Sequence, residues 1–155
     1  MTRNSILLTI IFSLFLNCDI TDTESLSDIE YNTEISIGIE SGQIYINLYD
    51  HPEIAGFQFD LYTEGGLEIN SLAAFGGAAK QHSFTVSTNL SNLRVLGFNL
   101  NGETIEASQL SYNTLLYLDI ESEGSGLIGI ENVILSGKNG YNIPTEIKSS
   151  PVSLP

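Results

Sequence analysis

The chain has 155 residues, with 19 acidic side chains against five basic ones and a formal net charge of −14 at pH 7. A protein this acidic repels phosphate backbones and anionic lipid, which argues against nucleic-acid binding and against charge-driven adsorption to membranes. Hydrophobic residues make up 42% of the sequence, enough to build a core, and this argues against disorder of the whole chain. The length leaves room for one domain.

The first 17 residues have the pattern of a signal peptide. Arg3 supplies a positive charge, and the apolar stretch ILLTIIFSLFL follows it at residues 6–16. A helix of that length spans roughly 16 Å, about half of the hydrocarbon core of a bilayer, so it is too short to act as a membrane anchor. We therefore predict a cleaved export signal over residues 1–17.

Cys18 is the only cysteine of the chain and lies two residues after the end of the apolar stretch. The sequence FLNC at residues 15–18 resembles a bacterial lipobox, in which the cysteine becomes the acylated first residue of the mature protein. Asn17 departs from that pattern, which prefers a small residue before the cysteine. We interpret Cys18 as a lipidation site, which predicts an exported lipoprotein anchored in the membrane of a bacterial cell envelope. An incidental cysteine in an ordinary signal peptide is the alternative, and the membrane and leaflet stay open.

Two segments flank the predicted domain. Residues 18–34 comprise the lipidated cysteine and a stretch with six acidic residues, no basic residue and no helical apolar stripe. Because such a stretch buries little apolar surface and repels itself, we predict an acidic, disordered tether. Residues 148–155 are predicted to be a disordered tail.

Between residues 35 and 147 apolar and polar residues alternate with a period of two, which is typical of strands with one buried face. Turn signals such as Asn101-Gly102 and Asn139-Gly140 separate the runs, and no segment has a convincing amphipathic helical pattern. The series predicts an all-β domain built as a two-sheet sandwich. The alternation predicts a core made of Ile37, Ile46, Phe57, Phe59, Leu61, Phe84, Val86, Leu96, Phe98, Leu118, Ile130 and Val133.

The sequence contains none of the familiar catalytic, metal or cofactor motifs. It has no G-x-S-x-G elbow, no phosphate-binding loop and no calcium loop of the D-x-[DN]-x-[DN]-G type. His51 and His82 lack the spacing of metal ligands, and we interpret both as exposed loop residues. The sequence therefore predicts a binding domain and not an enzyme, with no cofactor and no metal motif. Calcium held by scattered carboxylates and the oligomeric state stay open.

Tyr45 and Tyr49 share one side of a predicted strand, opposite the apolar side. An outward pair of tyrosines is typical of surfaces that stack against sugar rings, and it is equally typical of ordinary cross-strand packing. The pair is therefore a candidate glycan-binding site with a structural alternative.

Several segments, in this order, resemble cohesin-like domains over residues 35–147. They are IAGFQFDL at 54–61, LEI at 67–69, FTVSTN at 84–89, RVLGFNL at 94–100 and IENVILS at 130–136. The resemblance implies a two-sheet jelly-roll sandwich of about eight to nine strands, related in architecture to some carbohydrate-binding modules.

Cohesins of cellulosomes bind dockerin modules through one sheet face, so the resemblance implies a protein partner, which would be dockerin-like. Transferred strand by strand, the implied binding residues are Gln58, Asp60, Asn99 and Asn101. A polar face of this kind suits protein recognition better than sugar stacking. The alternative function is capture of a polysaccharide by a carbohydrate-binding module of the same fold. The identity of the partner is open.

The first prediction concerns the N-terminus of the mature protein. Mass spectrometry of the membrane-extracted protein should find Cys18 as an acylated first residue, because it is the only thiol at the boundary of the apolar stretch. A mature chain that begins well after residue 18, or one that carries a free thiol, would contradict it.

Overall fold

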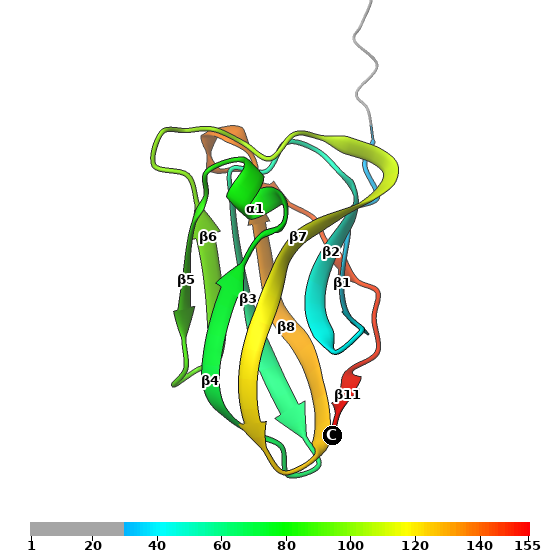
Figure 1. The fold of residues 1–155 in the computed structure, drawn as a ribbon. Helices are drawn as coiled ribbons and strands as arrows, with labels where there is room; N and C mark the ends of the chain where they lie inside the picture. The colour runs from blue at the N-terminus through cyan, green and yellow to red at the C-terminus, as the bar shows by residue number, and fades with distance from the viewer. Residues whose placement is uncertain (1–29) are drawn as a thin grey trace, which may run out of the picture. The chain divides into compact units, whose positions relative to one another are not determined.

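Two β-sheets packed face to face make up the domain (Figure 1). The computed structural model describes residues 30–155, so the predicted signal peptide, Cys18 and most of the predicted tether lie outside the described residues. The elements are β1 (Glu34–Glu40), β2 (Gln43–His51), β3 (Gly56–Glu64), β4 (Glu68–Phe75), α1 (Gly77–Gln81), β5 (Thr85–Asn89), β6 (Arg94–Phe98), β7 (Ser108–Glu123), β8 (Gly126–Ser136), the 3₁₀ turn η1 (Lys138–Gly140), β9 (Asn142–Ile143), β10 (Glu146–Ile147) and β11 (Val152–Leu154).

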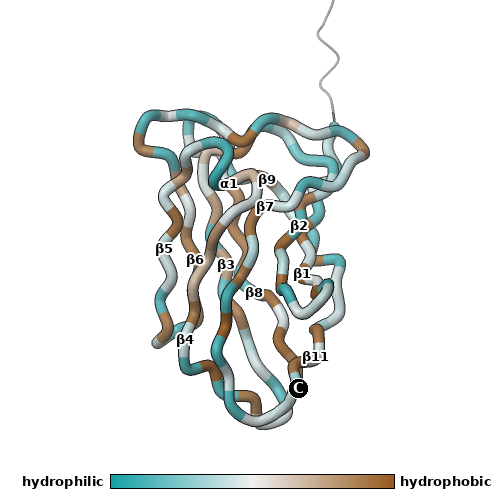
Figure 2. The backbone as a smooth tube through the Cα atoms, viewed as in Figure 1, coloured by the Kyte–Doolittle hydropathy of each residue, from teal (hydrophilic) through white to brown (hydrophobic). Residues whose placement is uncertain are grey.

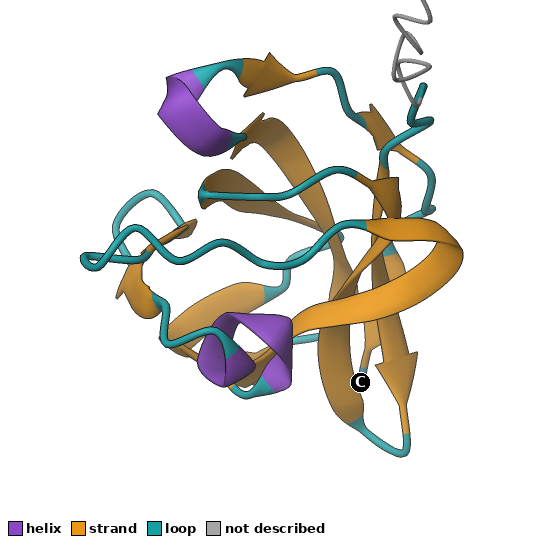
Figure 3. Ribbon diagram, turned by 90° about the horizontal axis from the view of Figure 1, so that it is seen from above, coloured by secondary structure: helices purple, strands orange, loops and turns teal. Residues whose placement is uncertain are grey.

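The strand order is β10-β1-β2-β7-β4 in one sheet and β11-β8-β3-β6-β5 in the other, with β9 paired to β8. The predicted all-β, two-sheet jelly-roll sandwich is confirmed, and Figure 3 shows helix confined to two short turns. The described region has eleven strands instead of eight or nine. The extra strands β9, β10 and β11 have two or three residues each, too few for an alternating pattern to be visible in the sequence. Among residues 30–155, no helix is long and apolar enough to span a bilayer.

The core lies between the two sheets and follows the predicted alternation in most strands. Figure 2 shows the apolar positions recurring along each strand. The ring of Phe57 stacks on Phe84 with 5.9 Å between centroids, and it packs against Phe59, which is fully buried. The predicted core residues that are buried are Ile37, Ile46, Phe57, Phe59, Leu61, Phe84, Leu118 and Ile130, while Val86 and Val133 are half-buried against them.

The predicted register of β6 is wrong. Leu96 and Phe98 were expected in the core, yet they are 38% and 36% exposed, while Val95 is fully buried. Gly97 is the second inward position of this strand, and a Cβ atom placed there would lie 2.1 Å from Cζ of Phe57. Because the Phe57 ring fills that space, glycine takes the inward position and the large apolar neighbours point outward.

The predicted disordered tail over residues 148–155 is also wrong. Strand β11 pairs antiparallel with β8, and Leu154 is buried. Ile37 donates its backbone N–H to Oγ of Ser149 at 2.9 Å, and Lys148 donates its backbone N–H to the carbonyl of Ile35 at 3.0 Å. The C-terminal segment is therefore part of the sandwich, held by backbone pairing that a short polar stretch does not reveal.

Alternation assigns both Phe59 and Phe98 to the core, but the structure buries only Phe59. Phe59→Ala should lower the free energy of unfolding by about 3–5 kcal/mol, because the side chain is fully buried. Phe98→Ala should lower it by less than about 1 kcal/mol, because that ring stands on the surface. Chemical denaturation of both variants measures the difference, and equal losses would show that Phe98 is a core residue.

Candidate functional site

The outer face of the sheet formed by β8, β3, β6 and β5 carries an exposed apolar group. Gln58 on β3 lies opposite Leu96 on β6 and opposite Ile134 on β8, so the three side chains form one row across the sheet. Phe98 stands two residues along β6 from Leu96 on the same face. Leu96, Phe98 and Ile134 are 38%, 36% and 50% exposed. We call the surface made by Gln58, Leu96, Phe98 and Ile134 the β3 face.

A polar network borders the β3 face on the same three strands. Arg94 of β6 donates from Nε and Nη2 to the two carboxylate oxygens of Asp60 at 2.6 and 2.8 Å, and Asn132 of β8 donates to the same carboxylate at 3.1 Å. These hydrogen bonds, above all those from Arg94, hold the pKa of Asp60 below its ordinary value, although burial opposes them. The network fixes the relative positions of β6, β3 and β8 beside the apolar row.

The structure corrects the role predicted for Asp60. Alternation places this residue outward, and it does lie on the outer side of β3, yet it is only 7% exposed. Arg94 and Asn132 cover its carboxylate and use its oxygens. Arg94, with a side chain that is 40% exposed, is the charged group of the network that a partner can reach. Sequence reasoning missed Arg94 because the ion pair joins residues 34 positions apart.

The two predicted asparagines lie beyond the end of β6. Asn99 donates from Nδ2 to the carbonyls of His82 and Ser83, and its Oδ1 accepts from the backbone N–H of Asn101 at 2.7 Å. Asn99 is therefore half-buried and ties the loop before β5 to the loop after β6. Asn101 is exposed in that second loop. Of the four predicted binding residues, only Gln58 belongs to the β3 face.

The outer face of the other sheet carries the predicted tyrosines. Tyr45 on β2 lies opposite Tyr117 on β7, which lies opposite Phe75 on β4, and the Phe75 and Tyr117 centroids are 5.7 Å apart. Tyr49 packs against Tyr112 with 4.7 Å between centroids. The structure thus adds three aromatic rings to the predicted pair, which gives five rings on three neighbouring strands. The sequence alone does not reveal this group, because it does not give the order of the strands in the sheet.

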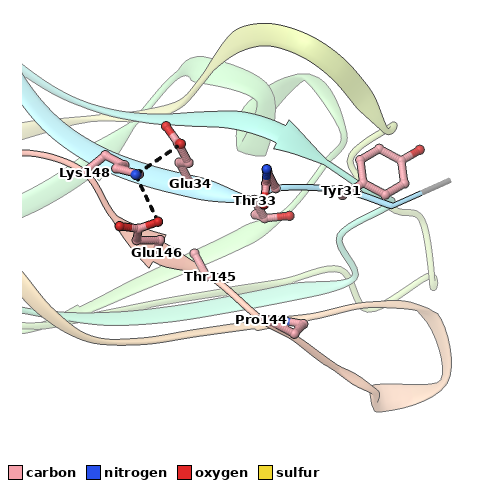
Figure 4. A pocket seen from close by; sticks show the side chains of 8 residues that line it. Tyr31, Thr33, Glu34, Pro144, Thr145, Glu146 and Lys148 are labelled. Carbon is pink, nitrogen blue, oxygen red and sulfur yellow. Dashed lines mark ion pairs between the residues drawn. The ribbon is translucent and has the colours of Figure 1, made fainter.

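A cleft of about 370 Å³ lies between the start of β1 and the segment around β10 (Figure 4). Lys148 projects into this region and pairs with Glu146 at 3.0 Å and with Glu34 at 3.7 Å. The hydrogen bond and charge of Glu146, assisted by Glu34, raise the pKa of Lys148. The lining is mostly polar, and its charged groups are the two carboxylates of Glu34 and Glu146 and the one ammonium group of Lys148. No group of three or more His, Cys, Asp or Glu within residues 30–155 is placed to hold a metal ion.

His51 and its neighbour Asp50 are not exposed loop residues. Asp50 adopts a left-handed conformation at φ 47°, and its carboxylate accepts the backbone N–H groups of Asn32 at 2.8 Å and Leu110 at 3.1 Å. His51 is fully buried at the end of β2, and its Nδ1 lies 2.9 Å from the carbonyl of Pro52. Its Nε2 has no hydrogen-bond partner within the described region. These residues join the N-terminal segment to β2 and β7 and are structural.

Solved structures with a similar fold include cohesin modules. A non-cellulosomal cohesin from the archaeon Archaeoglobus fulgidus aligns with a TM-score of 0.53 and 13% identity over 75% of this chain and 86% of its own. A chain of a type I cohesin–dockerin complex from Clostridium thermocellum aligns with a TM-score of 0.52 and 13% identity, over 80% and 94%. A type II cohesin domain from Acetivibrio cellulolyticus gives a TM-score of 0.52 and 11% identity, over 79% and 95%.

No family model and no curated protein matches the sequence. The similarity to the solved structures is one of architecture, and it shows that the chain has a cohesin-like fold.

Burial lowers the pKa of His51 from its ordinary 6.5, although the hydrogen bond to Pro52 and the charge of Asp50 act in the opposite direction. As the pH falls below about 6.5, His51 takes up a proton in the unfolded chain, while in the folded protein it stays neutral to a lower pH. The free energy of unfolding should therefore fall as the pH drops below about 6.5. The slope from this one group reaches at most about 1.4 kcal/mol per pH unit.

Denaturant melts between pH 8 and pH 5 measure this dependence. His51→Gln should flatten the slope. The same slope in the wild type and this variant would show that folding does not lower the pKa of His51.

Proposed function

We propose that this chain is a non-catalytic binding protein whose β3 face docks a protein partner, a dockerin-like module in the first instance. The observation that carries the proposal is the exposure of three large apolar side chains on β6 and β8, the two strands that flank β3 in one sheet. Single exposed apolar residues are common on protein surfaces, but several gathered on one face of a sheet are typical of an interface. The similar fold of cohesins, solved in complexes with dockerins, supports this class of partner.

The chemistry of the β3 face fits the anatomy of a protein interface. Leu96, Phe98 and Ile134 supply the apolar centre, and Gln58 supplies an amide that can donate and accept among them. Arg94 lies at the edge, held by Asp60, so its exposed guanidinium can meet a partner's carboxylate without first being ordered. Asp60 neutralises this guanidinium, so the pair itself adds no net charge to the β3 face of a chain that is strongly acidic.

We propose in addition that the chain is an exported lipoprotein of a bacterial cell envelope, anchored by the lipid on Cys18. The sequence pattern of residues 1–18 supports this part of the proposal. Such an anchor would hold the β3 face and its bound partner at the envelope. In this role the domain would act by localising another protein and would itself catalyse no reaction.

Charge introduced into the β3 face tests the docking proposal. Leu96→Asp and Ile134→Asp should each weaken partner binding by at least about 30-fold, because each buries a carboxylate where an apolar contact stood. The partner is captured from lysate of the source organism, and a panel of purified dockerin modules is tried in parallel, with affinities measured by calorimetry. Leu110→Asp is the matched control, because Leu110 is 77% exposed on β7 of the other sheet and should bind as the wild type does.

Thermal melts of the three variants establish that they are folded. Wild-type affinity in both face variants, or loss of binding in Leu110→Asp alone, would overturn the assignment of the β3 face.

A further inference from the structure

Three aromatic residues occupy one row across the outer face of the β2, β7 and β4 sheet, and we call this row the strip. Tyr45, Tyr117 and Phe75 hold directly opposed positions on three neighbouring strands. The rings of Tyr117 and Phe75 stack with 5.7 Å between centroids, whereas the ring of Tyr45 leans away from them over Gly38 of β1. Phe75 is 48% exposed although it is a large apolar residue at a sheet edge. The strip is unrelated to the β3 face, which belongs to the other sheet.

Two of the rings lie over glycines, which leaves them low on the sheet surface. A Cβ atom at Gly38 of β1 would lie 2.4 Å from Cζ of Tyr45, and one at Gly76 would lie 2.9 Å from Cδ2 of Tyr117. The glycines therefore provide the space that the rings occupy, and both tyrosines are half-buried there. A flat aromatic surface with one open side is the geometry that stacks against the C–H face of a pyranose ring.

Hydrogen-bonding groups lie beside this strip. Four residues along β2, roughly 13 Å from Tyr45, Tyr49 and Tyr112 form a second aromatic pair. Asn47 lies between the two aromatic groups, and its Oδ1 accepts the hydroxyl proton of Thr114 at 2.8 Å. None of the hydrogen bonds within residues 30–155 uses Nδ2 of Asn47, so that amide is available to a ligand hydroxyl. Together with the tyrosine hydroxyls, it offers donors and acceptors at the rim of apolar rings.

The charges of this face determine which ligands it admits. Strands β1, β2, β4 and β7 contain no lysine and no arginine. Asp119 and Glu121 follow Tyr117 along β7 on the same side and are exposed. A polyanion, whether sulfated, phosphorylated or rich in uronic acids, is therefore repelled, while an uncharged ligand with many hydroxyl groups meets carboxylate acceptors at the end of the strip.

We propose that this strip binds an uncharged pyranose glycan, with Tyr45 and the Tyr117–Phe75 pair contacting sugar rings and Asn47 hydrogen-bonding to a hydroxyl. Two binding faces on opposite sheets would then let the domain hold a protein partner and a polysaccharide at once. A cationic peptide is the competing occupant, because lysine and arginine also stack on tyrosine. The neutral amide of Asn47, which lies beside the strip between Tyr45 and Tyr49, favours the glycan, and the experiment distinguishes the two.

Affinity electrophoresis of the purified domain, residues 30–155 with the C-terminal strand included, provides the test once its melting curve shows that it is folded. The gels contain hydroxyethyl cellulose, mixed-linkage β-glucan or galactomannan, and calorimetry adds chitohexaose. Polygalacturonate serves as the anionic comparison and oligolysine as the cationic one. At least one uncharged glycan should bind, and polygalacturonate should not.

Tyr45→Ala and Tyr117→Ala should weaken glycan binding by roughly tenfold or more. Phe75→Ala should do the same without threatening the fold, because it removes an exposed side chain from an edge strand. Tyr45→Phe should keep most of the affinity, and Leu96→Asp on the β3 face should keep all of it. Failure of the wild-type domain to bind any of the four glycans would overturn the proposal, as would unchanged affinity in the folded alanine variants. Salt-sensitive binding of oligolysine without glycan binding would assign the strip to a cationic segment instead.

Discussion

The ring of Phe57 occupies the space that a side chain at position 97 would need, and the arrangement of one whole sheet depends on that contact. Because only glycine fits beneath the ring, β6 must turn Gly97 inward. Val95, two residues before Gly97 on the same face of the strand, is then buried in the core. The same choice turns Leu96 and Phe98 outward. A packing requirement inside the sandwich thereby produces the apolar centre of the β3 face, and the stack of Phe57 on Phe84 anchors it.

The polar residues of the two sheets then divide between structure and recognition. The carboxylate of Asp60 accepts hydrogen bonds from Arg94 and Asn132 and so aligns their strands with β3. The side chain of Arg94 stays partly exposed, so a partner can contact it. On the opposite sheet, Tyr45 rests over Gly38 and is half-buried there, while Phe75 is 48% exposed. Each sheet therefore combines an interior that is closely packed with an exterior that displays apolar groups. A sandwich with two such exteriors suits the proposed role, in which the domain holds other molecules on its two sheets.

Period-two alternation was sufficient to predict the fold class and the inward faces of β1, β2 and β3, because those strands place apolar residues at one parity only. It failed in β6, where Val95, Leu96 and Phe98 are apolar at both parities and the deciding residue is a glycine. It failed for Asp60 because the burial of that carboxylate depends on Arg94, which pairs across strands far apart in sequence. The strip of Tyr45, Tyr117 and Phe75 was likewise hidden, since alternation gives a face for each strand but not the order of strands in a sheet.

The most direct test of the central claim, that the β3 face contacts a protein, is site-specific photo-crosslinking in the native organism. A photoreactive phenylalanine analogue placed at position 96 or 134 lies on the β3 face, and the same analogue at position 110 lies on the other sheet with comparable or greater exposure. We expect one protein to be crosslinked from both positions 96 and 134 and not from position 110. Crosslinks to that protein from position 110 with none from positions 96 and 134 would contradict the account.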